Sequence, residues 1–427
     1  MSFHTAPSLN VSSALSSRGS LTANLSRRCT RPLPPNRASV VLASSSGQRP
    51  LTDGQKSATL NPIYEVSRSD RKKSTKEQKP ELVTTTQKAV PTVSPPTPSV
   101  PPMALAVGGA LAVAAAVKYI LDKPSRTYQE GKNTVGKEYN DWTDEGILEY
   151  YWGEHIHLGY YTDEELAAGY KKKDFIGAKE DFVREMLKWA DVPNDPKMIL
   201  DCGCGIGGTS RMIAKQFPNA KVIGITLSDS QVRRGTELAK EQGLQNVEFR
   251  VMNALEQTFA DNTFDLVWAC ESGEHMPDKN AYVNEMVRVL APGGSLAVAT
   301  WCQREETAEK PLTAEDKDNL QFLYDEWAHP YFVSYEEYAR IMEATGSMDK
   351  VVGDDWVKNT IASWRHSIWV GVYDPLPVVF KGPWVWYKTV REIVTLERMH
   401  RAFDRGLMTY GMIKGRKKAS STAEKSS

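Results

Sequence analysis

A glycine-rich stretch, DCGCGIGG at residues 201–208, combines residue types and spacing that could do chemistry. Gly203, Gly205 and Gly208 fit the G-x-G-x-x-G pattern, in which glycines let a backbone approach a nucleotide closely. Asp201 precedes the glycines, and a carboxylate at that point would suit a cationic group on the ligand. The stretch predicts a nucleotide-type cofactor, but the pattern alone does not identify it.

Side chains that could exchange protons occur in ESGEHM, residues 271–276. An imidazole titrates near neutral pH, which favours His275 as a general base, with Glu271 and Glu274 as alternatives. For Glu271, a purely structural hydrogen bond to a loop backbone is an equally good interpretation.

A third group of candidates lies in WGEHIHLGYY, residues 152–161. His155 and His157 are two residues apart, and on an extended segment that spacing sends side chains to opposite faces. We therefore expect at most one of them to point inward, and we keep His157 as a catalytic candidate. Tyr160 and Tyr161 could close over a cofactor and offer aromatic faces to a cation.

Alternating strands and helices position these groups. Strands are predicted over 197–200, 221–226, 247–252, 264–270 and 295–301, with helices over 209–217, 230–243 and 279–290. Such alternation indicates an α/β fold with a parallel sheet covered on both faces. Ligands bind beyond the carboxyl ends of strands in these sheets, and the glycine stretch lies at such an end.

The residues after the second strand argue against a dinucleotide. That cofactor needs an acidic residue at the strand end to bind its ribose, but the strand ends in Thr226-Leu227-Ser228. Asp229 falls at the start of the next helix, where a capping role fits better. A non-catalytic carrier on this fold would be expected to have a damaged glycine loop, and this loop is intact.

Three motifs, D-x-G-x-G-x-G-G, T-L-S-x-x-Q and P-G-G, resemble those of S-adenosylmethionine-dependent methyltransferases. The resemblance implies a class I Rossmann-like sheet with S-adenosyl-L-methionine as cofactor. Where many relatives have an acidic residue after the third strand, this chain has Asn253-Ala254. The cofactor-binding residues implied are Asp201, Gly203, Gly205, Gly207, Thr226, Leu227, Gln231, Asn253, Ala254, Glu271 and Tyr160.

A narrower resemblance joins residues 139–418 to the plastid and cyanobacterial prenylquinol methyltransferases. It is carried by YNDWTDEGILEYYWGEHIHLGYY, GITLSDSQVRR and ESGEHMPDK. It implies methyl transfer to a ring carbon of 2-methyl-6-phytylbenzoquinol and its solanesyl analogue, in tocopherol and plastoquinone biosynthesis. Because ESGEHMPDK equally resembles the tocopherol enzymes, γ-tocopherol C-methyltransferase activity stays open. This reaction requires no metal, and the catalytic candidates are His275, Glu271, Glu274 and His157.

The last hundred residues are rich in aromatic side chains. They include Trp327, Trp356, Trp364, Trp369, Trp384 and Trp386. The density predicts a helical, aromatic-rich C-terminal cap over about 302–400 that receives a prenylated substrate, although a well-packed lid would look the same. The basic KGRKK at 414–418 is expected to be a solvated tail that could also touch anionic lipid.

The N-terminal third differs in composition from the rest. Residues 1–49 contain no Asp or Glu but six Arg, as in a plastid transit peptide. Residues 50–102 are a predicted disordered linker, and 419–427 a disordered tail. The apolar stretch 103–121 is a short helix that we interpret as a membrane anchor, which suggests the inner envelope.

Composition excludes other functions. Lys and Arg together number 53, as do Asp and Glu, so no overall basic charge points to nucleic acid. The five cysteines form no C-x-x-C pair, which argues against zinc and against a disulfide framework. The expected partners are a prenylated quinol or tocopherol and a plastid membrane.

Overall fold

The computed structural model describes residues 102–124, 128–129 and 134–419. These residues belong to one compact unit, Pro95–Ser427. The expected transit peptide at 1–49, nearly all of the linker at 50–102 and residues 420–427 of the expected tail lie outside the described residues.

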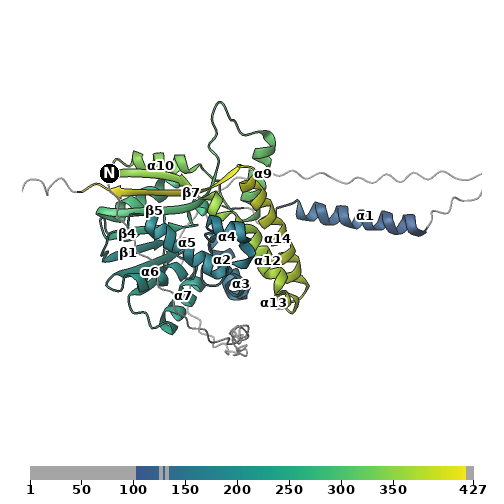
Figure 1. The fold of residues 1–427 in the computed structure, drawn as a ribbon, viewed down its shortest axis with the longest axis horizontal. Helices are drawn as coiled ribbons and strands as arrows, with labels where there is room; N and C mark the ends of the chain where they lie inside the picture. The colour runs from purple at the N-terminus through teal and green to yellow at the C-terminus, as the bar shows by residue number, and fades with distance from the viewer. Residues whose placement is uncertain (1–101, 125–127, 130–133, 420–427) are drawn as a thin grey trace, which may run out of the picture. The chain divides into compact units, whose positions relative to one another are not determined.

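A seven-stranded sheet forms the centre of the unit, in the order β3-β2-β1-β4-β5-β7-β6 (Figure 1). The strands are β1 (Met198–Cys202), β2 (Lys221–Thr226), β3 (Val247–Val251), β4 (Phe264–Cys270), β5 (Leu290–Gln303), β6 (Met348–Asp355) and β7 (Met408–Lys417). Strands β1 to β5 are parallel, whereas β7 runs antiparallel to both β5 and β6. The predicted parallel α/β sheet is confirmed, and two further strands extend it.

Helices cover both faces because each central strand is apolar on both sides. They are α5 (Phe175–Trp189), α6 (Gly208–Gln216), α7 (Asp229–Glu241), α8 (Lys279–Val289) and α10 (Tyr335–Ala344). In β4, Trp268 belongs to the core that contains Phe182 of α5. Its neighbour Val267 belongs to the opposite core, which contains Tyr282 of α8. This alternation fixes which face of the sheet each β4 side chain points to. The strand in turn positions the residues that follow it.

Further helices lie beyond the carboxyl ends of the parallel strands, where α12 and α14 are seen in Figure 1. They are α2 (Thr134–Glu145), α3 (Ile147–Trp152), α4 (Asp163–Ala168), α9 (Ala314–Glu326), α11 (Val357–Thr360), α12 (Ala362–Tyr373), α13 (Leu376–Val379) and α14 (Pro383–Asp404). Short 3-10 turns occur at Tyr170–Lys172 and Gly273–His275. The predicted cap over 302–400 is thus not helical throughout, since β6 lies within that range and belongs to the sheet.

The basic residues near the C-terminus do not form a solvated tail. Lys414 and Lys417 lie in β7, which pairs with β5 from Met408 to Arg416 and with β6 at Lys417. The ammonium group of Lys414 bonds the Trp189 carbonyl at 2.6 Å. That of Lys417 bonds the carbonyls of Val287 and Leu290, both at 2.7 Å. The sequence prediction was wrong because a lysine in a strand can satisfy backbone carbonyls with its ammonium group, which composition alone does not distinguish from a lysine in a solvated tail.

The apolar stretch at 103–121 forms a helix, α1 (Pro102–Leu121). Across the part of the chain that the structure describes, no helix combines the length and hydropathy needed to cross a bilayer. The membrane anchor expected over this stretch stays a prediction. Much of α1 is Ala and Gly, whose small side chains contribute little to the free energy of membrane insertion.

Candidate active site

The glycine loop connects β1 to α6 and opens onto a cavity of about 390 Å³. Gly203 and Gly205 have φ values of +90° and +55°, a region that glycine enters without steric cost. A Cβ on Gly205 would have no neighbour closer than 3.9 Å and would project into open space. A Cβ on Gly207 would lie 2.2 Å from the Phe249 ring. Gly205 therefore admits a ligand, whereas Gly207, contrary to expectation, lets the start of α6 pack against Phe249 of β3 and does not line the cavity.

The cavity brings together most of the predicted cofactor residues. Those lining it are Asp201, Gly203, Gly205, Thr226, Leu227, Gln231, Asn253, Ala254 and Glu271, together with the catalytic candidates His157 and His275. They follow β1, β2, β3 and β4, whose carboxyl ends meet at this edge of the sheet. The predicted residues that do not line it are Gly207, Tyr160, Tyr161 and Glu274.

Asp201 is buried at the floor of this cavity. Its Oδ2 accepts a hydrogen bond of 2.6 Å from the Ser210 hydroxyl. Burial raises the pKa of Asp201 to about 6. A buried carboxylate with one neutral partner is stabilised by a cation, so the site fits the amino group of S-adenosylmethionine.

Thr226 and Gln231 form the next part of the cavity wall. The Thr226 hydroxyl donates to Gln231 Oε1 at 2.6 Å. Ser228 caps α7 by accepting from the Gln231 amide, which holds this side chain at the helix start. Beyond β3, Asn253 Oδ1 accepts from the Leu255 amide at 3.1 Å. The wall is thus held by its own hydrogen bonds and offers short polar groups of the kind that bind a ribose and an adenine.

His155 and His157 lie side by side, against expectation. Both are buried, and His157 Nε2 is 3.3 Å from His155 Nδ1. Each also contacts the Thr209 hydroxyl, at 3.3 and 3.4 Å. The alternation argument failed because residues 154–161 are not a strand. Burial lowers the pKa of both imidazoles, that of His157 to about 4, so both are neutral at pH 7.

Tyr160 does not reach the cofactor cavity. Its amide donates to the Ala178 carbonyl of α5 at 2.8 Å, and its ring packs 5.6 Å from that of Trp356. The family resemblance placed this tyrosine over the cofactor. Instead Tyr139 of α2, which the sequence analysis did not consider, lines the cavity.

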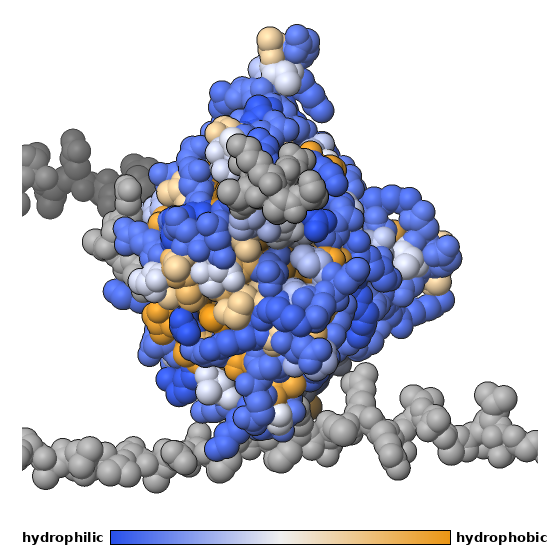
Figure 2. Space-filling view, turned by 90° about the vertical axis from the view of Figure 1, so that its left-hand side faces the viewer, coloured by the Kyte–Doolittle hydropathy of each residue, from blue (hydrophilic) through white to orange (hydrophobic). Residues whose placement is uncertain are grey.

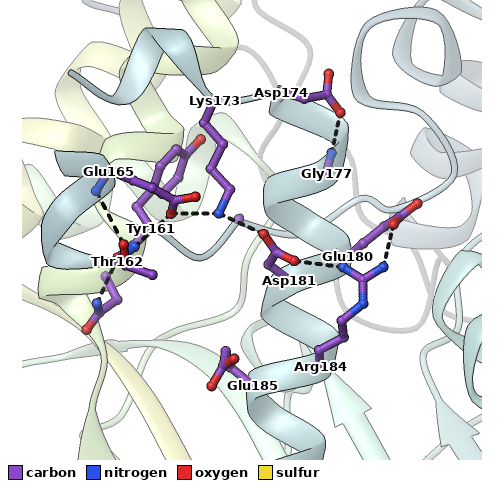
Figure 3. A network of polar contacts seen from close by, with 12 residues as sticks. Tyr161, Thr162, Glu165, Lys173, Asp174, Gly177, Glu180, Asp181, Arg184 and Glu185 are labelled. Atoms are coloured by element: carbon purple, nitrogen blue, oxygen red, sulfur yellow. Dashed lines mark hydrogen bonds and ion pairs between the residues drawn. The ribbon is translucent and has the colours of Figure 1, made fainter. Parts of the chain in front are cut away.

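A network of charges holds the segment after the two histidines against α5 (Figure 3). The largely buried Lys173 ammonium lies 2.7 Å from Glu165 and 2.8 Å from Asp181. Thr162 and Glu165 form a capping box at the start of α4. Because this network links α4 to α5, it restricts movement of residues 154–161 at the wall of the cavity.

Glu271 follows the last residue of β4 and adopts a φ of +48°. Its Oε1 accepts two hydrogen bonds of 2.7 Å, from the Leu158 amide and from the Tyr410 hydroxyl. Burial is the main cause that raises its pKa, and nearby Glu274 raises it further. Left-handed backbone at a non-glycine residue carries strain that is common at functional sites.

Glu274 lies behind Glu271 and is also buried. It accepts a 2.7 Å hydrogen bond from the Thr300 hydroxyl, and burial raises its pKa. The buried Lys279 ammonium donates to the carbonyls of Gly273 and Met276, at 2.8 and 2.7 Å. The Lys279 side chain therefore holds residues 273–276 in place. The carboxyl groups of Glu271 and Glu274 are held near each other in a low-dielectric environment.

His275 lies beside the carboxyl pair but is a poor base. Its Nε2 hydrogen-bonds the Tyr139 hydroxyl at 3.0 Å, and its ring lies 4.4 Å from that of His329. Burial lowers the pKa of His275 to about 3. The expectation that it titrates near pH 7 is therefore wrong, because desolvation disfavours the charged imidazolium. It remains placed to form a hydrogen bond with a substrate.

A second cavity of about 630 Å³ adjoins the first. Residues common to both walls are Val135, Tyr139, Ile156, Glu271 and His275. Its aromatic lining includes six tryptophans, Trp142, Trp152, Trp301, Trp327, Trp364 and Trp386. Three of these belong to the predicted aromatic cap, whereas Trp356 packs near Phe182 and Trp384 is exposed. Glu274 lines this cavity rather than the cofactor cavity.

Four residues at the site were missed by sequence reasoning: Tyr139, Trp301, His329 and Tyr410. A signal existed for Trp301, because it lies near the carboxyl end of β5, the parallel neighbour of β4, and should therefore lie near Glu271. Tyr410 lies in the antiparallel β7, directly across from Trp301. Nothing in the spacing of residues 407–413 predicts that pairing.

Among the described residues, no group of three or more side chains has the composition of a metal site.

The comparisons with known proteins agree with this geometry. A family model described as a methyltransferase domain matches residues 199–294. Among solved structures, a geranyl diphosphate C-methyltransferase from Streptomyces coelicolor A3(2) is 20% identical, with a TM-score of 0.52 over 69% of this chain and all of that one. A [4+2]-cyclase, SpnF, has a TM-score of 0.54 at 21% identity over 69% of this chain and all of that one, so the fold alone does not define the reaction.

The fold and the glycine-loop cavity define a Rossmann-like methyltransferase whose cofactor is S-adenosylmethionine. The 2-methyl-6-phytyl-1,4-hydroquinone methyltransferase of Synechocystis sp. is 42% identical over 316 residues, which cover 73% of this chain and 95% of that protein. A probable chloroplastic tocopherol O-methyltransferase of Oryza sativa is 38% identical, over 64% of this chain and 75% of that one. The chain belongs to the methyltransferase family that contains these proteins.

Proposed function

We propose that this protein transfers a methyl group from S-adenosylmethionine to a ring carbon of a prenylated benzoquinol, as part of tocopherol and plastoquinone biosynthesis. The observation that carries the proposal is the second cavity, which is apolar, aromatic and joined to the cofactor cavity. A quinol ring at the shared wall would leave its prenyl chain among the tryptophans. The similarity to the Synechocystis enzyme supports the same acceptor class.

S-adenosylmethionine supplies an activated methyl group when it is bound. Asp201 would pair with its amino group, and Gly203 and Gly205 would lie against its methionine part. Thr226, Gln231 and Asn253 would contact the ribose and adenine. This assignment rests on their shared position around one cavity and on the open space beside Gly205.

Glu271 is the proposed general base, with Glu274 as its partner. In this role the Glu271 carboxylate accepts the proton of the quinol hydroxyl, which increases electron density at the neighbouring ring carbon. A base must later take the proton of that ring carbon. The raised pKa of Glu271 makes it a stronger base than an exposed carboxylate, and its position in both cavity walls supports this role.

Tyr139 and His275 complete the proposed acceptor site. Their hydrogen bond of 3.0 Å leaves a paired hydroxyl and neutral imidazole at the wall common to both cavities. These groups would orient a quinol hydroxyl without carrying a charge. Alignment of the ring carbon with the methyl group is the larger requirement, since correct positioning alone can lower a barrier by several kcal/mol.

The proposed location is the plastid. The absence of acidic residues from 1–49 supports it, as do the relatives from Oryza sativa and Arabidopsis thaliana whose names describe them as chloroplastic. We propose association with the inner envelope, because a prenylated quinol dissolves in membrane lipid rather than in water.

The proposal is tested by incubating the full chain with methyl-labelled S-adenosylmethionine and either 2-methyl-6-phytylbenzoquinol or γ-tocopherol. We expect label in the benzoquinol. Label in γ-tocopherol alone would instead assign the terminal tocopherol methylation, which the Oryza relative makes the second candidate. Label in neither acceptor would contradict a prenylquinol function on this fold.

A further inference from the structure

Exposed apolar side chains are concentrated at one point of the domain, residues 372–390, which we term the α13 tip. It comprises the end of α12, all of α13 and the start of α14. Phe380 is 82% exposed and Trp384 is 67% exposed. Nine of the twenty exposed large hydrophobic residues among the described ones lie here. An apolar patch of this kind marks a surface that is covered in the working protein.

We infer that the α13 tip inserts into the surface of a lipid bilayer and places the mouth of the second cavity against the membrane. The inference rests on the proposed function, because it assumes an acceptor dissolved in lipid. The occupant of the surface is thus the bilayer itself, not another protein.

The tip is continuous with the cavity. Val372, Val379, Trp386 and Val390 line the second cavity, yet each is 44% exposed or more. Side chains that face both the cavity and solvent locate its opening. The mouth of the acceptor cavity therefore lies within the apolar patch, where a prenyl chain could pass between lipid and protein without crossing water.

The residue types suit an interface between lipid and water. Trp and Tyr, which favour this depth of a bilayer, occur at Tyr373, Trp384, Trp386 and Tyr387. The more apolar Phe380 is the most exposed large hydrophobic side chain of the tip. This arrangement matches a shallow insertion, in which apolar side chains are buried below the headgroups.

The charges of the tip favour the same occupant. Residues 372–390 contain two lysines and one acid, Asp374. The Asp374 carboxylate accepts a 2.7 Å hydrogen bond from the Tyr150 hydroxyl. The tip therefore presents no excess negative charge to anionic headgroups. Figure 2 shows the end of the domain away from α12 and α14, where hydrophilic residues predominate and apolar ones occur in small groups.

The test places an environment-sensitive fluorophore on the tip of the full chain through Phe380→Cys. The four described cysteines are buried, and Cys29→Ser removes the remaining thiol. Val352→Cys on β6, where the native residue is 43% exposed, is the matched control. With vesicles of equimolar phosphatidylcholine and phosphatidylglycerol, we expect a blue shift at position 380 and none at 352.

No shift at position 380, or equal shifts at both positions, would overturn the inference. So would a shift at 380 that needs no vesicles and rises with protein concentration, because the tip would then join two copies of the chain. The tip can be tested separately from catalysis with the Phe380→Ser/Trp384→Ser double variant, since neither residue lines a cavity.

The double variant should bind vesicles about tenfold more weakly than the native chain. It should methylate a detergent-dispersed acceptor normally and a vesicle-embedded acceptor more slowly. An unchanged rate on the embedded acceptor would contradict the inference. If the native chain methylated neither benzoquinol nor tocopherol, the proposed function would fail, while the fluorescence result would still decide the membrane contact.

Discussion

Glu271 has a strained backbone, and desolvation and the nearby carboxyl group of Glu274 raise its pKa. Glu271→Gln keeps an oxygen that can accept from Leu158 and Tyr410 but removes the base. We expect kcat to fall by about 10²- to 10⁴-fold. Cofactor affinity, measured by calorimetry, should change little. A variant with native kcat would show that another group takes the proton.

The same carboxyl group predicts a pH dependence. A base acts in its ionised form, so the rate should rise as pH increases through the raised pKa of Glu271 and level off above it. The neutral His275, with a pKa near 3, should add no further step around pH 6 to 7. A rate profile with a step near 6.5 that persists in Glu271→Gln would indicate an imidazole base instead.

Asp201 should stabilise the bound cofactor but lower the stability of the cofactor-free protein. Its pKa is about 6 here and 3.8 ordinarily, so folding disfavours its ionised form. That cost is absent below pH 3.8, grows between 3.8 and 6, and reaches about 3 kcal/mol above 6. At pH 7.5, Asp201→Asn should therefore weaken cofactor binding at least tenfold by calorimetry, yet raise the melting temperature of the cofactor-free protein.

A lower melting temperature for Asp201→Asn would mean that the carboxylate is paired in the free protein. Asn retains an acceptor for the Ser210 hydroxyl, which limits other losses. Unchanged cofactor affinity would remove Asp201 from the proposed binding site.

At the residue scale, motifs identified the site better than local periodicity did. The positions of Asp201, Thr226 and Gln231 follow from strand ends, which the sequence shows directly. The pKa of His275 does not, because it depends on burial by α2 and by residues near His329. Position along the chain predicts which residues lie near the site. The degree of desolvation of a side chain can be known only from the packed structure.

Strand β7 shows why element boundaries near the C-terminus were missed. Its sequence, MTYGMIKGRK, has two glycines and three basic residues, which is atypical of a central strand. Gly411 and Gly415 are required by packing: a Cβ at Gly411 would lie 2.5 Å from the Cys302 sulfur. Tertiary contacts therefore override the local preference, whereas the apolar strands β1, β2 and β4 were located from their sequence.

A pair of lysines tests the structural role of β7. The ammonium group of Lys417 bonds the carbonyls of Val287 and Leu290, whereas that of the exposed Lys418 bonds only the loop carbonyl of Gly346 among the contacts described. Lys417→Met should lower the free energy of unfolding by about 1–3 kcal/mol, measured in urea. Lys418→Met should change it by less than about 0.5 kcal/mol. Equal effects of the two substitutions on the free energy of unfolding would mean that Lys417 behaves like a lysine in a solvated tail.

At the scale of the whole molecule, the proposed reaction depends on the apolar cavity between the sheet and the outer helices. Gly371 of α12 lines that cavity, and a Cβ there would meet nothing within 4 Å. Gly371→Trp should fill part of the space, raising KM for a long-chain quinol by about tenfold or more while leaving cofactor affinity unchanged.

Gly371→Ala is the matched control for this prediction. It adds one methyl group, should leave KM near the native value, and should stabilise α12 by roughly 0.5–1 kcal/mol. If Gly371→Trp methylated the long-chain acceptor with native KM, the prenyl chain would have to bind elsewhere.

The sheet order has a consequence for folding during synthesis of the chain. Among the described strands, β6 pairs only with β7, and β5 pairs with β4 on one side and with β7 on the other. Until β7 inserts between them, β6 and one edge of β5 are therefore unpaired. During vectorial synthesis both edges leave the ribosome before their shared partner does. The nascent chain thus carries two unpaired edges that could template aggregation, and one late insertion closes them together. A chaperone that shields residues 290–303 and 348–355 during that interval would raise the yield of folded protein more than one acting on the finished domain.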